Sequence, residues 1–487
     1  MAKRVAVIDI GSNSVRMVVY EKSSRFSFHI LHEAKSGVRL SQNAYKNGGN
    51  LQEPAMQRAY DALADFTTII DSFKARKVLC VATSALRDAP NKAVFINKIR
   101  NSLGINIKVI NGQREAYLGA IACANLLPEQ NNAISIDIGG GSTEFAIINK
   151  QDISSTISLD LGTVRLKELF FDSNEIESAN IYIDSELDKL DALNPSTMIG
   201  IGGTFRAIAN AILKNSGYPL DKLHAYEPAY DDFSSILYKI LDSNNGNLKK
   251  LGIKESRFDI IKPGALILLR VLKRFKIKEL VTSGVGVREG VYLCDLLRNS
   301  NDRFPRNYNV SLRNILDLHT ENLNHSNQLA KVAKEIFDIT HCELGIDKKY
   351  RYELSTAAKL LFCGSTIHFY SSSKHGYNLI QDTLEFGFTH KQITLISTLV
   401  KYAKRKLPSS SHINEFKPLL PDVKTLNTLN YILSLSIALL AHRPRNIDFE
   451  LSFSNRKLLV TSKKSMYLAR DGVKALYEQE YFSIKFL

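Results

Sequence analysis

The sequence has 487 residues, too many for one hydrophobic core, which predicts two to four domains. Its composition, 44% hydrophobic and 23% charged, excludes a disordered or fibrous class and predicts an ordered globular protein. The net charge is +15, with +6 in residues 1–305 and +9 in residues 306–487, so it either favours polyanionic partners or serves only to keep the chain soluble.

The first 125 residues alternate between short apolar runs and segments with helical spacing. Gly104 follows the second helical segment as a C-cap glycine does, and Pro128 follows the third. The alternation predicts an α/β domain with a helix-covered sheet. Strands are expected at residues 5–10, 15–21, 26–35, 78–83 and 107–110, and helices at residues 56–72, 91–103 and 114–127.

Residues 130–300 repeat this α/β pattern, and residues 301–305 form the clearest linker candidate. Strands are expected at residues 134–138, 144–149, 153–159, 197–201 and 280–283. Beyond the linker, helices are expected at residues 326–340, 353–369, 374–385, 390–403 and 423–441. The end of the chain predicts a small α+β cap, with strands at residues 449–453, 457–461 and 482–486 and a helix near 467–478.

The cysteines and the apolar runs indicate the subcellular compartment to be expected for the protein. The five cysteines are scattered without a CxxC pair, which is typical of reduced thiols in a cytosolic protein. No uninterrupted apolar run reaches 18 residues, and the N-terminus enters a strand at once, so we expect neither a membrane span nor a signal peptide. The sequence therefore predicts a cytoplasmic protein.

One segment occurs twice, as VAVIDIGSNS at residues 5–14 and AISIDIGGGS at residues 133–142. Each is an apolar strand that ends in Asp-Ile-Gly and enters a turn of small residues whose backbone N–H groups can approach a phosphate. A single turn of this kind is readily structural, but the pair predicts two similar subdomains facing each other across a phosphate-binding cleft. The phosphate-binding candidates in the two turns are Ser12, Asn13, Ser14, Gly139, Gly140, Gly141, Ser142 and Thr143.

A third glycine turn lies between a predicted strand and a predicted helix start. It contains Gly202, Gly203 and Thr204. Helix N-terminal amides and a threonine hydroxyl together favour an anion. Three such turns point to a substrate with several phosphates, although this third turn alone is also compatible with a purely structural role.

Four carboxylates accompany these turns. Asp9 and Asp137 end equivalent strands, and Glu144 begins the strand after the second turn. Hard oxygen ligands beside phosphates suit Mg²⁺, with Mn²⁺ as the alternative ion. Glu115 lies in the first turn of a predicted helix, where it could orient and deprotonate a water or simply complement the helix dipole.

Arg87 directly follows a predicted strand, in the segment TSALRD. Its guanidinium could clamp a phosphate in bidentate fashion, or it could form a surface ion pair with Asp88. The sequence contains no GxxxxGK[ST], HExxH or GxSxG motif, so a P-loop, a zincin site and a nucleophile elbow are not expected.

The motifs DIGSNS, TSALRDA, GQREA, DIGGGSTE, GIGGT and SGVGVREG occur in one order, and with them the chain resembles the exopolyphosphatase / guanosine pentaphosphate phosphohydrolase (Ppx/GppA) family from about residue 3 to residue 300. The resemblance implies an α/β fold of the sugar kinase/Hsp70/actin superfamily, with two duplicated RNase H-like subdomains around a phosphate cleft. It also implies that Glu115 is the catalytic base, that Arg87 belongs to the site, and that Glu144 fills the family's acidic position.

The helical region from about residue 310 is similar to the HD-like domain of the family's long members. Related sequences carry a His-Glu or His-Asp pair where this chain has Leu361 and Phe362, so we expect the fold without its metal site, and His325 and His375 as surface or core residues. Long members also imply a homodimer. The expected domains are two RNase H-like subdomains, a helical HD-like domain lacking the metal dyad, and the small α+β cap, at residues 1–127, 128–303, 304–445 and 446–487.

The expected reaction is Mg²⁺-dependent attack of water on the terminal phosphorus of a phosphoanhydride chain. The resemblance leaves inorganic polyphosphate, guanosine pentaphosphate (pppGpp) or both as substrate. Arg257 and Arg288 are candidates for the other phosphates, or are exposed ion-pair residues. Two other functions stay open, namely a sugar- or acetate-kinase-like phosphotransferase and a catalytically silent alarmone or polyphosphate sensor. No aromatic-basic RNA motif occurs, so direct nucleic-acid binding is not expected.

Overall fold

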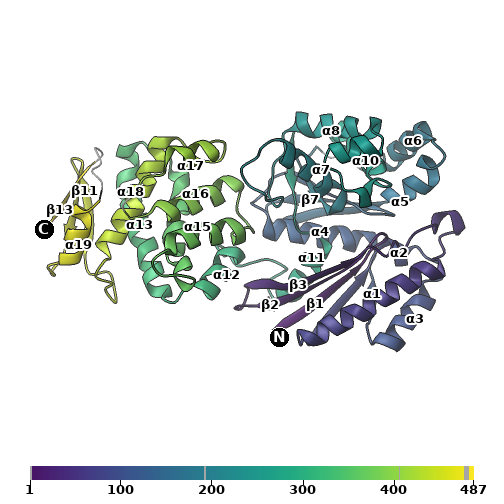
Figure 1. The fold of residues 1–487 in the computed structure, drawn as a ribbon, viewed down its shortest axis with the longest axis horizontal. Coiled ribbons are helices and arrows are strands. Elements are labelled where there is room, and N and C mark those ends of the chain that lie inside the picture. The colour runs from purple at the N-terminus through teal and green to yellow at the C-terminus, as the bar shows by residue number, and fades with distance from the viewer. Residues whose placement is uncertain (1–2, 191–193, 405, 477–481) are drawn as a thin grey trace. The chain divides into compact units, whose positions relative to one another are not determined.

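The structure is a computed structural model that describes residues 3–190, 194–404, 406–476 and 482–487 (Figure 1). The chain divides into two compact units, Met1–Tyr308 and Asn309–Leu487. Within the described ranges, every helix is too short or too polar to cross a bilayer. The predicted linker at residues 301–305 contains no helix or strand and precedes the boundary between the units.

The first unit begins with a five-stranded sheet in the order β3-β2-β1-β4-β5. Its strands are β1 (Arg4–Ile10), β2 (Val15–Lys22), β3 (Phe28–Ser36), β4 (Lys77–Ala82) and β5 (Ile107–Val109). Helices α1 (Glu53–Ser72) and α3 (Lys92–Leu103) share a hydrophobic core with this sheet, with Leu63 and Phe95 among its fully buried side chains. These elements confirm the strands and helices predicted for this part of the chain.

A second five-stranded sheet has the order β10-β9-β6-β7-β8. Its strands are β6 (Ala133–Ile138), β7 (Thr143–Asn149), β8 (Asp152–Leu159), β9 (Thr197–Ile201) and β10 (Glu279–Thr282). In both sheets the first strand pairs antiparallel with the second and parallel with the fourth. The register also shifts at equivalent places, after Val19 in β2 and after Ile147 in β7. The duplication predicted from the repeated segment is therefore confirmed.

We call the two halves of the first unit lobe 1, built on the first sheet, and lobe 2, built on the second. The helices of lobe 2 pack around a core that includes Phe205, Phe233 and Leu268. Its helices are α5 (Thr163–Leu166), α6 (Ile176–Leu187), α7 (Gly202–Asn215), α8 (Tyr230–Asp242), α9 (Asn245–Lys250) and α10 (Ile261–Phe275), with a π-helical turn η2 (Lys167–Phe171) and a 3₁₀ turn η3 (Glu255–Arg257).

Two helices, α4 (Gly112–Leu126) and α11 (Val287–Leu296), lie between the sheets and pack on each other (Figure 1). Helix α4 contacts β7 and β8 of the second sheet, whereas α11 contacts β1 of the first sheet. A Cβ atom on Gly290 would lie 2.0 Å from the carbonyl oxygen of Leu118, so only glycine allows this close crossing. The crossing joins the two lobes.

The second unit is mainly helical, with a core that includes Phe337, Leu354 and Ile396. Its helices are α12 (Val310–His319), α13 (Leu323–Leu344), α14 (Arg351–Leu360), α15 (Ser372–Thr383), α16 (His390–Tyr402), α17 (Ser410–Glu415), α18 (Val423–Leu439) and α19 (Tyr467–Lys474). The unit also contains a small sheet of three strands, β11 (Glu450–Ser454), β12 (Lys457–Thr461) and β13 (Ser483–Phe486). Their order in the sheet is the same as their order in the sequence. The helix predicted to reach residue 478 ends at Lys474, and residues 477–478 lie outside the described ranges.

One predicted helix, at residues 353–369, is wrong in its second half. Helix α14 ends at Leu360, and a separate 3₁₀ turn, η5 (Cys363–Thr366), follows it. A Cβ on Gly364 would lie 2.2 Å from the carbonyl oxygen of Ser372, so this turn packs directly against the start of α15. The apolar spacing of the sequence did not reveal this backbone contact.

Candidate active site

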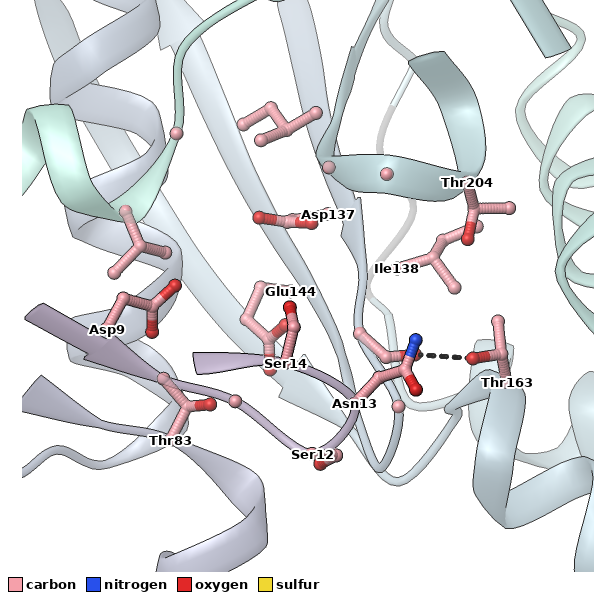
Figure 2. A pocket seen from close by; sticks show the side chains of 18 of the residues that line it. Asp9, Ser12, Asn13, Ser14, Thr83, Asp137, Ile138, Glu144, Thr163 and Thr204 are labelled. Carbon is pink, nitrogen blue, oxygen red and sulfur yellow. Dashed lines mark hydrogen bonds between the residues drawn. The ribbon is translucent and has the colours of Figure 1, made fainter. Parts of the chain in front are cut away.

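A cavity of about 150 Å³ opens between the lobes, and the two repeated loops line it (Figure 2). Each loop joins the first two strands of its sheet and is closed by the same hydrogen bond. The N–H of Gly11 donates to the Ser14 carbonyl at 3.1 Å, and the N–H of Gly139 donates to the Ser142 carbonyl at 2.9 Å. The repeat in the sequence is therefore a repeat in backbone geometry, and it places both loops at one site.

Besides the predicted access to backbone N–H groups, the glycines of the second loop allow close packing between the lobes. A Cβ on Gly140 would lie 2.6 Å from the Cβ of Ser12, and a Cβ on Gly141 would lie 2.2 Å from the hydroxyl oxygen of Tyr45. Glycine thus allows the loop of lobe 2 to touch lobe 1. Within the described part of the chain, the N–H groups of Ser12, Asn13, Gly140 and Gly141 donate no hydrogen bond, so they are available to an anion.

The third predicted turn forms the N-terminus of α7, where no side chain caps the helix. Gly202 has a φ of 76°, and a Cβ there would lie 2.2 Å from a carboxylate oxygen of Asp137. A Cβ on Gly203 would lie 2.3 Å from Nη2 of Arg257, so this guanidinium rests on the first turn of the helix. Thr204 is buried and lines the cavity. The open helix terminus and the arginine together present positive charge at one side of the cavity, which suits an anion.

Acidic side chains also line the cavity, and Figure 2 shows Asp9, Asp137 and Glu144 around it. Asp137 in β6 is the register partner of Glu144 in β7, so both side chains lie on one face of the sheet. The hydroxyl of Ser158 donates to Glu144 Oε1 at 2.8 Å. Burial raises the pKa of Asp9 to about 6, and it also raises the pKa of Asp137 and of Glu144. These carboxylates lack sufficient positive charge nearby to offset their desolvation.

This donor set fits the metal predicted from the sequence. Asp9, Asp137 and Glu144 offer only carboxylate oxygens, the donors that Mg²⁺ and Mn²⁺ prefer. In the described ranges, no three His, Cys, Asp or Glu side chains converge closely enough to form a closed protein cage. Because Mg²⁺ commonly keeps water and takes substrate oxygens, one or two of these carboxylates suffice to hold it.

Glu115 projects from the first turn of α4, whose N-cap residue Asn111 accepts the N–H of Arg114 at 2.8 Å. Glu115 is buried, with 8% of the residue exposed, and it lines the cavity. Burial, and next the charge of Glu144, raise its pKa well above the usual range, and the guanidinium of Arg87 opposes them. A buried carboxylate of raised basicity that faces a cavity lined with arginines is suited to accept a proton.

Arg87 itself does not line the cavity. Its Nη1 donates to Glu115 Oε2 at 2.8 Å, and its Nη2 donates to the hydroxyl of Ser142 at 3.1 Å. It also lies 3.5 Å from a carboxylate oxygen of Asp88, the ion pair considered from the sequence. In this geometry Arg87 holds Glu115 against the loop of lobe 2 instead of reaching the space where a phosphate fits.

Four arginines line the cavity, namely Arg16, Arg206, Arg257 and Arg288. Arg288 forms an ion pair with Glu33 at 2.6 Å. The other three have no carboxylate within ion-pair distance among the residues the structure describes. Burial and then the charge of Arg16 lower the pKa of Arg206 to about 10, and the same two causes lower the pKa of Arg257. Uncompensated guanidiniums that repel one another favour a polyanion.

Arg16 and Arg206 were not identified from the sequence. Arg16 had a signal, because aligning DIGSNSVR with DIGGGSTE places it where the second repeat has Glu144. The strand registers agree, since Asp9 pairs with Arg16 as Asp137 pairs with Glu144. Arg206 lies in the first turns of α7 and donates to the Ser283 carbonyl at 3.0 Å, an arrangement that no spacing in the sequence indicates.

Comparisons with known proteins agree with this geometry. Residues 18–299 match the Ppx/GppA phosphatase family, and residues 309–471 match Ppx/GppA phosphatase, domain III. The chain is 27% identical over 485 residues to a guanosine-5'-triphosphate,3'-diphosphate pyrophosphatase of Photobacterium profundum, covering 95% of this chain and 92% of that protein. It is 28% identical over 410 residues to a protein of the same name from Pseudoalteromonas atlantica, covering 81% and 78%.

Solved structures show the same fold for the first unit. An exopolyphosphatase from Cytophaga hutchinsonii ATCC 33406 matches with a TM-score of 0.56 at 28% identity, over 60% of this chain and 97% of that one. A Ppx/GppA family member from Aquifex aeolicus matches with a TM-score of 0.53 at 28% identity, over 62% and 99%. Because the family match spans more than half of the sequence and the duplicated sheets agree with it, the chain belongs to the Ppx/GppA phosphatase family and is a hydrolase.

Proposed function

We propose that the chain removes the terminal phosphate from inorganic polyphosphate, from pppGpp, or from both, in an Mg²⁺-dependent hydrolysis. The observation that carries this proposal is the mixed charge of one cavity. Burial raises the pKa of the carboxylates that line this cavity. Three arginines also line it, and they lack a carboxylate partner in the described ranges. A phosphate chain with a bound divalent cation supplies both missing charges. Relatives named for pppGpp hydrolysis and for exopolyphosphatase activity support the two substrate classes.

Glu115 acts as the general base in this proposal. Its carboxylate accepts a proton from the attacking water, and the two N–H donors of Arg87 keep it oriented toward the loop of lobe 2. Arg87 is a positioning residue, because its contacts run to Glu115 and Ser142. The arrangement links the base directly to the glycine loop that would hold the terminal phosphate.

The remaining residues bind and orient the phosphate chain. The N–H groups of Ser12, Asn13, Gly140 and Gly141 and the open N-terminus of α7 would bind the non-bridging oxygens, whereas the N–H of Gly139 is already bonded to the Ser142 carbonyl. Asp137 and Glu144, with Asp9 nearby, would hold the Mg²⁺ ion, which would supply positive charge to neutralise the transferring phosphate. Arg16 and Arg206 add positive charge from the two lobes.

The two arginines predicted to bind other phosphates differ. The guanidinium of Arg257 packs against the first turn of α7, and it has no carboxylate partner in the described ranges. Arg288 is already paired with Glu33. We therefore assign the phosphate after the terminal one to Arg257, while Arg288 mainly balances the carboxylates, including Asp9, whose pKa it lowers.

The direct test is phosphate release by the purified full chain with Mg²⁺, compared for long-chain polyphosphate, pppGpp and ATP. We expect release from at least one of the first two, and an Arg257→Gln variant with about a 10- to 150-fold lower kcat/KM, the value of a lost charge-assisted hydrogen bond. Arg274→Gln is the matched control, because Arg274 is an exposed arginine of lobe 2 outside the cavity.

Other outcomes separate the alternatives. Tight binding of both substrates without phosphate release would favour the sensor, and transfer of labelled phosphate from ATP to an acceptor would favour a kinase. The homodimer implied by the resemblance stays a prediction, which sedimentation velocity of the full chain tests.

A further inference from the structure

A second cavity, of about 430 Å³, lies inside the second unit. Residues of α13, α18 and α19 and of the segment after α14 line it. It adjoins the position where the resemblance places the HD metal pair. Leu361 is buried in the core there, and Phe362 lines the cavity. A concave space of this volume is in the range of small-molecule sites.

Aromatic rings give the cavity flat apolar surfaces. The ring of Phe362 stacks on that of His325, with centroids 5.7 Å apart and an interplanar angle of 26°. The guanidinium carbon of Arg443 lies 5.4 Å from the Phe362 centroid. Phe369 and Tyr370 also line the cavity and are 72% and 92% exposed, an unusual degree for such large rings. Planar aromatic ligands stack well on surfaces of this kind.

The charge of the cavity has one sign. Lys404 and Arg443 line it, and none of its described lining residues is acidic. Neither cation has a carboxylate within ion-pair distance in the described ranges. Both hold left-handed backbone conformations, with φ values of 85° and 46°, which non-glycine residues adopt at a cost and which concentrate at functional sites. The cavity therefore suits an anion.

His325 supplies a polar atom that needs a partner. The side chain lines the cavity, the residue is 7% exposed, and its buried Nδ1 has no hydrogen-bond partner among the residues that the structure describes. Burial, and then the charge of Arg443, lower its pKa, so the ring is neutral and offers one donor and one acceptor. A ligand with polar groups at the edge of a flat ring would satisfy it.

We propose that this cavity is a binding site for a purine nucleotide, with the base stacked on Phe362 and its phosphate held by Lys404 and Arg443. Inorganic phosphate or a phosphate chain would use the cations but leave the aromatic surfaces and His325 without a role. A neutral planar ligand would leave the two cations unpaired. A purine nucleotide uses all three features. The proposal does not depend on the hydrolysis proposed for the first unit.

The test is calorimetric titration of the full chain with 5′-GMP and 5′-AMP, which have no phosphoanhydride bond to hydrolyse. We expect at least one of them to bind more tightly than inorganic phosphate and than its own nucleoside. Phe362→Leu removes the stacking ring and should weaken binding about 5- to 150-fold. Arg443→Asn removes the cation and should weaken binding about 10- to 150-fold, while asparagine tolerates the left-handed backbone.

The matched control is Arg456→Asn. Arg456 is another exposed arginine of the second unit with a left-handed φ, 54°, and it does not line the cavity. Its variant should bind within about twofold of wild type. If Phe362→Leu lowers the melting temperature, Arg443→Asn at an exposed position still decides the question.

Three results would overturn the proposal. The first is no binding of either nucleotide at millimolar concentration. The second is binding that both cavity variants retain but Arg257→Gln loses, because the ligand would then occupy the cavity between the lobes. The third is inorganic phosphate binding as tightly as the nucleotides, which would reduce the site to a simple anion site.

Discussion

The two lobes of the first unit share one framework and differ in charge at one matched position. Their sheets have the same strand order, and their first loops are closed by the same hydrogen bond. At the partner position on the second strand, however, lobe 1 carries Arg16 opposite Asp9, and lobe 2 carries Glu144 opposite Asp137. One duplicated strand pair thus presents a cation to the cavity, and the other presents a second carboxylate.

Through this change at one matched position, the duplicated fold becomes an asymmetric site. In our account the carboxylate pair of lobe 2 holds the divalent cation, and the arginine of lobe 1 binds the phosphate chain. The two loops also differ in the size of their side chains, since Gly140 and Gly141 of lobe 2 make room for Ser12 and Tyr45 of lobe 1. Variants at these positions test the two roles separately.

The largest effect is expected for the carboxylate pair of lobe 2. Asp137→Asn or Glu144→Gln should lower kcat on the order of 10³-fold, because a metal clamp contributes several kcal/mol of transition-state stabilisation. Activity titrated against Mg²⁺ measures the effect, and the variants should require more Mg²⁺. Glu177→Gln is the control, since Glu177 is exposed in α6. An unchanged Mg²⁺ requirement in both variants would show that Asp137 and Glu144 do not bind the metal.

Arg16 should behave differently from its counterpart Glu144. Arg16→Gln removes one charge-assisted hydrogen bond, worth about 1.5–3 kcal/mol, so kcat/KM should fall about 10- to 150-fold. The Mg²⁺ requirement should stay that of the wild type. Steady-state kinetics at several Mg²⁺ concentrations separate the two effects. A variant that needs more Mg²⁺ at unchanged KM would contradict the division of labour between the lobes.

Gly140→Ala tests the contact between the loops. The added Cβ would lie 2.6 Å from the Cβ of Ser12, and overpacking of this kind typically lowers the free energy of unfolding by about 1–3 kcal/mol. Gly37→Ala is the matched control, because its Cβ would meet nothing within 4 Å and its φ is not left-handed. Denaturant unfolding compares the two. Equal stabilities would show that the loops do not need the glycine to approach.

The smallest effect is expected at the surface contact between the lobes. Lys46 forms an ion pair with Asp172 at 2.9 Å, and both side chains are partly exposed. Lys46→Gln should leave the free energy of unfolding nearly unchanged, because exposed ion pairs gain little in water. Denaturation at low and high salt measures the difference. A loss of unfolding free energy comparable to that of Gly140→Ala would instead make this ion pair a main contact between the lobes.

Much of the first unit could be predicted because its signals are local. Apolar runs located the strands of both sheets, and the repeated Asp-Ile-Gly segment located both loops. The alignment of the repeats also contained Arg16, which the motifs alone did not single out. Long-range packing could not be predicted in this way. Nothing in the spacing of α4 and α11 shows that each helix packs on the sheet of the other lobe.

Pairwise contacts inside the site were also beyond the sequence. The sequence left Arg87 as a phosphate clamp or as an ion-pair partner of Asp88, and it did not indicate the hydrogen bonds to Glu115 and Ser142, because α2 (Ser84–Arg87) lies against the start of α4 only in the folded chain. In the second unit, Leu361 and Phe362 indicated only the loss of a metal pair. Their different directions, one into the core and one into a cavity, depend on where α14 ends.

The role of Glu115 as the base is tested by a single-turnover measurement on Glu115→Gln with the preferred substrate and Mg²⁺, together with the dissociation constant of that substrate. Glutamine keeps the shape of the side chain and an oxygen acceptor for Arg87 but cannot act as a base. We predict an unchanged dissociation constant and a hydrolysis rate lowered about 10²- to 10⁴-fold. Wild-type turnover in this variant would contradict Glu115 as the base that activates water in the cavity between the lobes.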